Sequence, residues 1–257
     1  MSRTIRLAGA LALAATLGAC DSSSGPANQS AAVQLSLATR AGPGLAPSGP
    51  QLSGVSVDYT DGLNTLSITQ VQMVVREVEL KTVADPAQCD PAVSDDTCEE
   101  LESGPYLLDL PLSAGASSVV TVDVVPGSYD EFEFKIHKPD DTAENAAFLA
   151  INPTFDGVSI RVTGTWNDVA FTYESDLNAS QEVGMAPPLV VTDAGTSDFT
   201  LSVNIATWFR TSGNMLIDPS TANKGGANEN TVKNNIEQSF DAFEDENHNG
   251  GDDHSGS

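Results

Sequence analysis

Residues 66–80 read LSITQVQMVVREVEL, and this stretch decides between a helical and a β-rich fold. Its apolar residues fit a helical period tolerably, but five of them are β-branched: Ile68, Val71, Val74, Val75 and Val78. Branching at Cβ restricts the side chain in a helix and suits a pleated sheet. The stretch therefore predicts one long or bulged β-strand.

The segments on both sides alternate between apolar and polar residues, as half-buried strands do. Val33, Leu35 and Leu37 show this period upstream, and Phe199, Leu201, Val203 and Ile205 show it downstream. Between them we expect strands at 55–59, 106–112, 118–125, 129–137, 148–152, 158–162, 169–173 and 183–191. Pro187 and Pro188 place the last of these at a sheet edge or in a loop.

One turn signal predicts a hairpin. Pro126-Gly127-Ser128 separates two strand candidates and suits a tight turn. In such a hairpin the apolar side chains of both strands face inward, namely Val120, Val122, Val124, Phe132, Phe134 and Ile136.

About ten strands with regular turn spacing indicate an all-β fold, either an antiparallel β-sandwich or a barrel. We predict an antiparallel β-sandwich, immunoglobulin-like or transthyretin-like, over residues 33–210. A loop at 211–228 and one amphipathic helix at 229–243 follow, the helix placing Val232, Ile236, Phe240 and Phe243 on one face. An acidic tail occupies 244–257.

The first twenty residues, MSRTIRLAGALALAATLGAC, have the layout of a secretory signal with an apolar run too short to span a membrane. Leu17-Gly18-Ala19-Cys20 matches a lipobox, which predicts removal of residues 1–19 and acylation of Cys20. The alternative is an ordinary signal peptide that contains a cysteine. Residues 20–32 are small and polar and suit a flexible tether. We expect lipid anchoring to the inner or outer membrane of a cell envelope.

Charge excludes one class of partner. The chain has 36 acidic and 11 basic residues, and removing Arg3 and Arg6 leaves 9 basic residues and a net charge of −27. Such a chain cannot replace the counterions of a phosphate backbone, so we expect no nucleic acid as partner. Cations, neutral glycans and basic or neutral envelope proteins remain.

Cys89 and Cys98 enclose CDPAVSDDTC, part of a stretch at 85–102 with seven acids and no base. In an oxidising compartment this pair most simply forms a disulfide that holds a solvated loop. A metal or redox site is the alternative, although the spacing is not Cys-x-x-Cys and no histidine lies nearby.

The tail carries one pattern that suits a ligand. In DENHNGGDDHSG the oxygen-bearing residues Asp245, Asn247, Asn249 and Asp253 take positions one, three, five and nine of a calcium loop, with Gly250 at position six. Position twelve is Gly256 where an EF-hand has a bidentate Glu. A solvated acidic tail without bound calcium is the alternative.

Catalytic motifs are absent from the sequence: there is no His-Glu-x-x-His, Gly-x-Ser-x-Gly, phosphate loop or Gly-x-Gly-x-x-Gly. We expect His137 at the surface, and Trp166, Trp208 and Phe209 in core or strand-edge packing rather than glycan stacking. Paired carboxylates of a glycan-active hydrolase are a spatial feature that a sequence does not reveal.

The order of segments resembles a known family. ITQVQMVVREVEL is followed by YLLDLPL, VVPGSY, GTWNDVAFTYES, NIATWF and LIDPST. This order looks like that of bacterial lipoproteins that carry a β-sandwich domain of unknown function, and VVPGSY is loosely similar to transthyretin-like modules. The resemblance implies a fold and an envelope location, but no activity.

We therefore expect a lipid-anchored, non-catalytic binding or structural module without a resident cofactor. The alternatives are a weak calcium-binding module that uses the tail and a hydrolase that uses two carboxylates.

The disulfide gives a first prediction. Closing so short a loop removes unfolded-chain entropy worth about 2.5–3 kcal/mol in the chain-entropy model. Thiol titration of the mature protein under denaturing, non-reducing conditions should therefore detect no thiol at Cys89 or Cys98. Two reactive thiols at these positions would exclude the crosslink.

Overall fold

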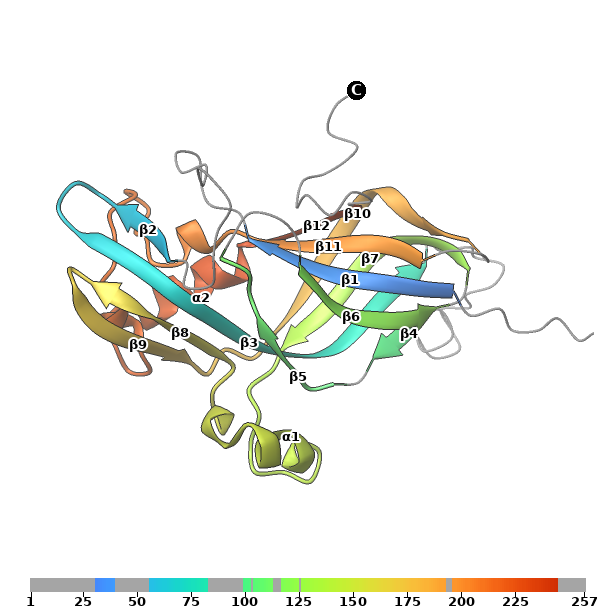
Figure 1. Cartoon of the computed structure of the whole chain (residues 1–257), viewed down its shortest axis with the longest axis horizontal. Coiled ribbons are helices and arrows are strands. Elements are labelled where there is room, and N and C mark those ends of the chain that lie inside the picture. The colour runs from blue at the N-terminus through green and yellow to red at the C-terminus, as the bar shows by residue number, and fades with distance from the viewer. Residues whose placement is uncertain are drawn as a thin grey trace, which may run out of the picture.

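The computed structural model describes residues 31–39, 56–82, 99–102, 104–112, 117–124, 126–192 and 196–244. Within these ranges most of the chain lies in two β-sheets (Figure 1). The sheets pack against each other, which confirms the all-β sandwich. Neither α-helix of the described residues, one of six and one of nine residues, is long and apolar enough to cross a membrane.

The smaller sheet has four strands in the described residues. Their order is β12 (Phe240–Glu244), β11 (Thr196–Val203), β1 (Ala31–Thr39) and β6 (Ser117–Val124). β1 pairs antiparallel with β6 but parallel with β11. The antiparallel sandwich that we predicted therefore contains one parallel pair among the described strands. β1 and β11 lie far apart in the chain, so no short hairpin forces them to run in opposite directions.

The larger sheet has eight strands in the described residues. Its main path is β10 (Ala179–Val191), β7 (Gly127–Ile136), β3 (Thr65–Thr82), β8 (Ile160–Trp166) and β9 (Val169–Ser175). Three short strands also pair with β3: β2 (Val57–Thr60), β4 (Glu99–Glu102) and β5 (Tyr106–Asp109). β4 lies within the stretch that we expected to be a solvated loop.

The long bulged strand predicted at 66–80 is confirmed as β3, which has 18 residues. Its first half pairs with β2 and β8, and its second half pairs with β4 and β7. The pairing register shifts between Ile68 and Gln70 and again between Arg76 and Glu79, where Glu77 has a positive φ of 51°. Such bulges bend a strand and increase its twist, so one strand can serve both halves of the sandwich.

The hairpin predicted at Pro126-Gly127-Ser128 is wrong. The turn connects β6 of the smaller sheet with β7 of the larger one, and these strands pair with other partners. Inward-facing alternation requires only a shared core, and strands in facing sheets share one as well as paired strands do. Val124, Phe132, Phe134 and Ile136 are buried as expected.

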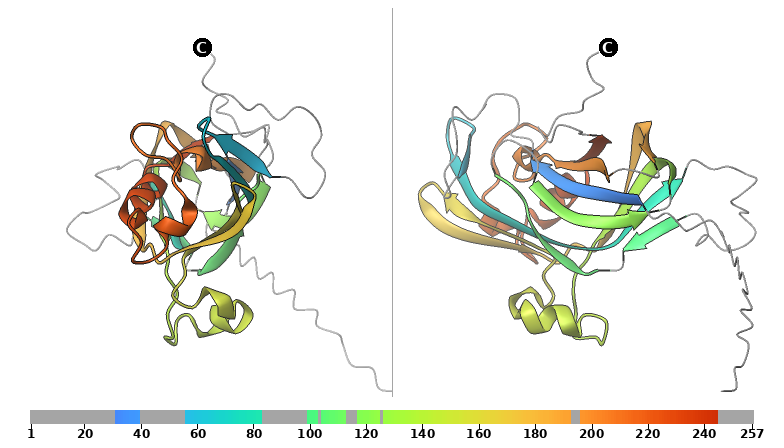
Figure 2. Two further views of the ribbon diagram at one scale, coloured as in Figure 1. Left: turned by 90° about the vertical axis from the view of Figure 1, so that its left-hand side faces the viewer. Right: turned by 45° about the vertical axis from the view of Figure 1, so that its right-hand side comes forward.

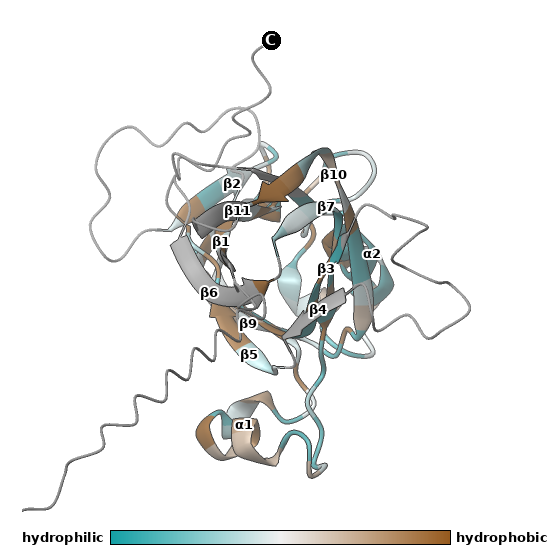
Figure 3. Cartoon of the chain, turned by 90° about the vertical axis from the view of Figure 1, so that its right-hand side faces the viewer, coloured by the Kyte–Doolittle hydropathy of each residue, from teal (hydrophilic) through white to brown (hydrophobic). Residues whose placement is uncertain are grey.

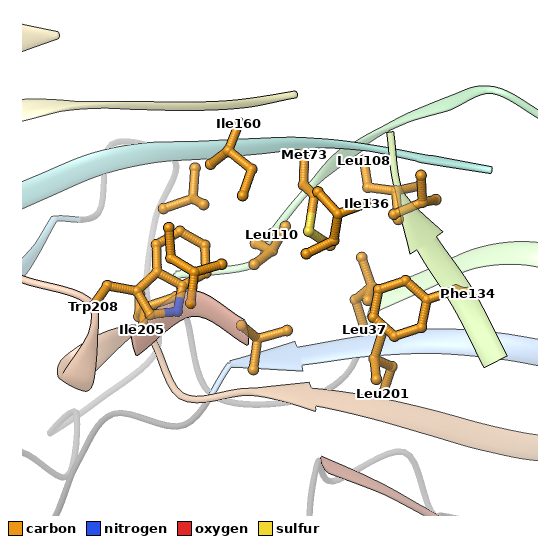
Figure 4. Close-up of a cluster of buried hydrophobic side chains, with 14 of the residues drawn as sticks. Leu37, Met73, Leu108, Leu110, Phe134, Ile136, Ile160, Leu201, Ile205 and Trp208 are labelled. Carbon is orange, nitrogen blue, oxygen red and sulfur yellow. The ribbon is translucent and has the colours of Figure 1, made fainter. Parts of the chain in front are cut away.

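The core fills the space between the sheets. Leu37 and Leu201 of the smaller sheet lie opposite Phe134 and Ile136 of the larger one, near Met73 of β3 (Figure 4). At the edge of this contact Phe240 of β12 packs edge-to-face on Phe134, with ring centroids 5.2 Å apart. Both sheets therefore depend on one apolar interior.

Where the smaller sheet ends, the chain after residue 204 covers the larger sheet (Figure 1). This cover consists of η3 (Ile205–Thr207), η4 (Pro219–Ala222) and α2 (Glu229–Glu237). Trp208, Phe209, Val232 and Ile236 belong to the same core as the strands. Val232 and Ile236 lie beyond residue 210, where we predicted the sandwich to end. Asn223 also pairs with the free edge of β9, since its Oδ1 accepts a 2.8 Å hydrogen bond from Glu174 N.

The predicted helix at 229–243 is half correct. α2 ends at Glu237, and Phe240–Glu244 form a strand that pairs antiparallel with β11. Ser239 helps to end the helix: its Oγ donates to Ile236 O at 2.7 Å and accepts from Trp208 Nε1 at 2.8 Å. Phe240 fitted the helical period, but burial against Phe134 places it in a strand.

The strand predicted at 148–152 is wrong, because α1 (Ala146–Ile151) and η2 (Pro153–Phe155) occupy this region. Together they form a lobe, residues 138–158, that projects from the sandwich (Figure 3). The chain on both sides of the lobe is hydrogen-bonded to the same residue of β3. His137 N donates to Val74 O at 2.9 Å, and Val74 N donates to Ser159 O at 2.8 Å. Val74, Phe148 and Phe155 form a separate small core.

Gly164 of β8 gives a test of this packing. A Cβ at this position would lie 1.9 Å from the backbone oxygen of Ser67 in β3, so Gly164→Ala should destabilise the protein by about 3 kcal/mol in urea unfolding. Gly184→Ala is the matched strand control, because nothing lies within 4 Å of its added Cβ. A similar loss in both variants would contradict the close approach of β3 and β8.

Candidate functional site

The site residues predicted from the sequence lie outside the described residues. They are Cys20, Cys89, Cys98, Asp245, Asn247, Asn249 and Asp253. Acylation, the disulfide and calcium binding therefore stay predictions. Among the described residues, no group of three or more His, Cys, Asp or Glu could hold a metal ion.

The segment before the calcium motif is a strand, whereas we expected a helix. The motif begins at Asp245, and the residue before it, Glu244, ends the strand β12 rather than a helix. An EF-hand loop follows a helix. The chain therefore lacks the incoming helix of that motif as well as the carboxylate at position twelve.

The described residues offer a different candidate, at one end of the sandwich. Three loops meet there: 61–64 between β2 and β3, 167–168 between β8 and β9, and 211–215 after η3 (Figure 2). We call this region the loop end. In Figure 1 it lies at the left, at the start of β3.

Asp61 joins the first loop to the third. Its Oδ1 accepts hydrogen bonds from the backbone N–H groups of Leu63 at 2.9 Å and Asn64 at 2.7 Å. Its Oδ2 accepts one from Leu216 N at 2.9 Å, across 155 positions of sequence. These backbone donors, those of Asn64 and Leu63 above all, lower the pKa of Asp61 to about 2.

Asn167 joins the first loop to the second. Its Oδ1 accepts from Thr65 N at 2.9 Å, and its Nδ2 donates to Asn64 Oδ1 at 3.1 Å. Asn167 and Asp168 have φ values of 50° and 67°, which suit a two-residue hairpin turn with both central residues left-handed. Asn and Asp tolerate that conformation better than other non-glycine residues.

The third loop is held from within. Arg210 donates from Nε to Ala206 O at 3.0 Å and from Nη1 to Asn214 O at 2.8 Å. Asn235 of α2 donates to the backbone oxygens of Trp208 and Arg210. Side chains therefore fix all three loops, and binding there would cost little ordering entropy.

Exposed apolar residues lie on or beside these loops. Five large hydrophobic residues are exposed in the described part of the chain, and three of them lie here: Leu63 is 81% exposed, Val169 69% and Met215 41%. Val169, Phe171 and Tyr173 alternate along β9. Of the three, only Tyr173 is fully buried. Three of the five exposed residues at one end of the fold make that end the candidate contact surface.

The sequence offered a weak signal for this surface that we did not use. Asp61-Gly62-Leu63-Asn64 is a turn sequence with an apolar residue at its centre. Val169 and Met215 carry no comparable signal, since only the fold brings their loops to the same end.

His137 is buried, at 8% exposure, which corrects the expectation of a surface residue. Its Nε2 lies 2.9 Å from Asn145 Oδ1, and Asn145 Nδ2 donates to Asp140 Oδ1 at 2.8 Å. Because Asn145 Oδ1 is an acceptor, His137 donates from Nε2. The contacts join β7 to the lobe, which is a structural role.

The carboxyl groups give no support to a hydrolase. Among the described residues, every carboxyl whose pKa departs clearly from its ordinary value is shifted downward: Asp61, Glu77, Asp140, Asp176 and Glu229. The general acid of a glycosidase needs a raised pKa.

The aromatic residues follow the prediction of packing roles. Trp208 and Phe209 are buried in the core, and Trp166 packs against it. Trp166 itself is partly exposed.

Comparisons with known proteins find nothing similar. No family model matches the chain, and no curated protein or solved structure does.

Asp61 gives a pH prediction. Because its folded-state pKa of about 2 lies below the ordinary value, its stabilising effect is complete above about pH 4 and is lost as the pH falls toward 2. Asp61→Asn removes this titration and leaves an amide facing Leu216 N. Thermal unfolding of both proteins from pH 2 to pH 6 should show a deficit of the variant at pH 6 that shrinks toward pH 2. Parallel curves would contradict the role of Asp61.

Proposed function

We propose that the protein is a lipid-anchored, non-catalytic binding module of the cell envelope that presents its loop end away from the membrane. The observation that carries this proposal is the direction of the first described strand. β1 begins at the end of the sandwich opposite the three loops (Figure 1).

The pairing register supports this direction. Ala31 lies beside Val124, just before the chain turns into β7, and Ala32 lies beside Thr196 at the start of β11. Thr39, at the other end of β1, lies beside Val203, from which the chain continues toward the loop at 211–215. An anchor at Cys20 therefore acts on the end far from Leu63 and Val169.

The lengths of the segment before β1 and of β3 are compatible with a loop end that points away from the membrane. Eleven residues lead from Cys20 to Ala31 and span at most about 40 Å when extended. The 18 residues of β3 extend about 50–60 Å farther along the sandwich. The net charge of −27 on the mature chain repels anionic lipid headgroups and favours an orientation that stands away from the bilayer.

The chemistry of the described residues favours binding over catalysis. The loop end combines fixed backbone, exposed apolar side chains and ionised carboxylates, which suits contact with another molecule. The carboxylate of Asp61 accepts hydrogen bonds from three backbone N–H groups and joins two of the loops.

Energy transfer from the membrane tests the orientation. The acylated protein, with a fluorescent amino acid at position 63 or at position 190, is placed on phosphatidylcholine vesicles that contain an acceptor-labelled lipid. Val190 is the matched control position, because it is also exposed but lies beside Ser128 at the β1 entry end. We expect more transfer from position 190 than from position 63, and no vesicle binding after Cys20→Ser.

Two outcomes would overturn the proposal. Equal transfer from both positions, or more from position 63, would exclude the orientation. Vesicle binding that persists after Cys20→Ser would exclude the lipid anchor.

A further inference from the structure

We infer that the free edge of β9 binds an extended segment of another polypeptide, which adds to the larger sheet as a further strand. The inference rests on the proposed binding function and names the class of partner. β9 is the last strand on its side of the main path of the larger sheet, and among the described strands it pairs with β8 alone. It begins directly after the loop at 167–168, so this edge starts at the loop end (Figure 1).

The hydrogen bonds of Asn223 show which backbone groups lie on this edge. Glu174 N donates to Asn223 Oδ1 at 2.8 Å, and Thr172 O accepts from Asn223 Nδ2 at 3.4 Å. The backbone groups of residues 172 and 174 therefore point away from β8. Backbone groups of alternate residues point to the same side of a strand, so those of Ala170 also point outward. No hydrogen bond of the described residues uses Ala170 N–H, Ala170 O or Thr172 N–H.

Asn223 occupies one position of the edge in the manner of a neighbouring strand. Its side-chain amide accepts from one backbone N–H and donates to one backbone C=O, as a residue of a parallel strand does. A residue placed two positions nearer to the start of β9 would meet the corresponding pair of groups, Thr172 N–H and Ala170 O. The first half of the edge therefore has the geometry that accepts a strand and lacks the partner that the second half has.

Neither charge nor proline protects this first half. Val169, Ala170 and Thr172 are exposed, and their stretch VAFT contains no charged residue and no proline. Free strand edges usually carry lysine, proline or a bulge that prevents pairing with other chains. β10, at the other end of the main path, has Pro187 and Pro188, which lack N–H donors. An edge left open over one short stretch suits β-strand addition, in which backbone hydrogen bonds provide the affinity.

The side chains of β9 define the partner further. Phe171 is half-buried and packs edge-to-face on Phe209 of the core, with ring centroids 6.3 Å apart. Val169 lies two positions away on the same face and is 69% exposed. An added strand would lie beside both, and an apolar side chain on this face would cover surface that is exposed without it. We therefore expect a segment with β-branched or aromatic residues at alternate positions.

A second copy of the chain is disfavoured as the occupant. Two copies paired with Ala170 opposite Thr172 would place Asp168 opposite Glu174 twice, and like charges in that position destabilise a sheet. This register would also use Thr172 O, which already accepts from Asn223. The net charge of −27 on the mature chain opposes every register. The favoured occupant is therefore a neutral or basic strand of a different protein.

Amide hydrogen exchange followed by NMR tests whether the edge is open. The protein is the chain 20–257 with Cys20→Ser, labelled with ¹⁵N. The amide protons of Ala170 and Thr172 should exchange with water at least about 10-fold faster than that of Glu174, because Asn223 accepts only the last of these. Exchange of Ala170 and Thr172 as slow as that of Glu174 would mean that the edge is already paired, and would exclude it as a binding site.

A strand peptide tests the occupant. The probe is a peptide of about nine residues that alternates valine and threonine and has a lysine at each end. The comparison peptide has the same side chains and charge, but N-methyl groups replace the backbone N–H donors of its inner residues. At about 1 mM, the probe should slow exchange at Ala170 and Thr172 about 3-fold or more, whereas the comparison peptide should leave it unchanged.

Two substitutions at one position separate the backbone from the side chain. Ala170→Pro removes an outward N–H and leaves the pairing of β9 with β8 in place, because proline is tolerated where the N–H faces away from the sheet. It should abolish the effect of the probe at Thr172. Ala170→Val keeps the N–H and should preserve that effect. Thermal unfolding verifies that both variants are folded, and the exchange measurements on the parent chain do not depend on either.

Other outcomes overturn the inference. Equal protection by the N-methylated peptide would mean contact through side chains or charge, and no protection by the probe would exclude an added strand. Self-association in sedimentation that is lost in Ala170→Pro would assign the edge to a second copy. Each of these results, together with the expected energy transfer from the membrane, would refute the partner and leave the anchored orientation intact.

Discussion

The pairing of β3 with five other strands is the interaction on which the rest of the structure depends. The pairing register of β3 shifts at three places, so the strand can bend and follow both halves of the sandwich. Each half has a different cover: the smaller β-sheet on one side, and the segment from η3 to α2 on the other. The absence of a side chain at Gly164 lets β8 approach β3 closely enough to complete this arrangement. The start of β3 is also the loop end, the region that we propose for binding.

Much of the fold could be predicted from local signals. The β-branched residues of 66–80 identify β3, and alternation identifies most of the strands of both sheets. The errors share a physical cause, which is that periodicity records burial but not the partner that provides it. Phe240 is apolar at a helical spacing from Ile236, yet its contact with Phe134 lies across the sandwich. Phe148 looked like part of a short strand, but its partner is Val74 beneath the lobe.

The loop end could not be predicted for a related reason. Its three loops lie far apart in the sequence, and the contact from Asp61 to Leu216 exists only in the folded chain. Polar turn residues such as Asp61, Asn64 and Asn167 are ordinary in a sequence, because each also suits an isolated turn. In this fold they hydrogen-bond to one another's loops. The turn residues Asp61, Asn64 and Asn167 thus also fix the loops beside Leu63 and Val169.

The central place of β1 has a mechanical consequence. A strand at a sheet edge could peel away one hydrogen bond at a time if the membrane and a bound partner were pulled apart. β1 instead lies between β11 and β6, with pairing on both sides along its length. In the proposed anchored form, a load directed along β1 would act in shear on many hydrogen bonds at once. Under the proposed lipid anchoring, the attachment of the domain would therefore resist force, even though it depends on a single strand near the beginning of the chain.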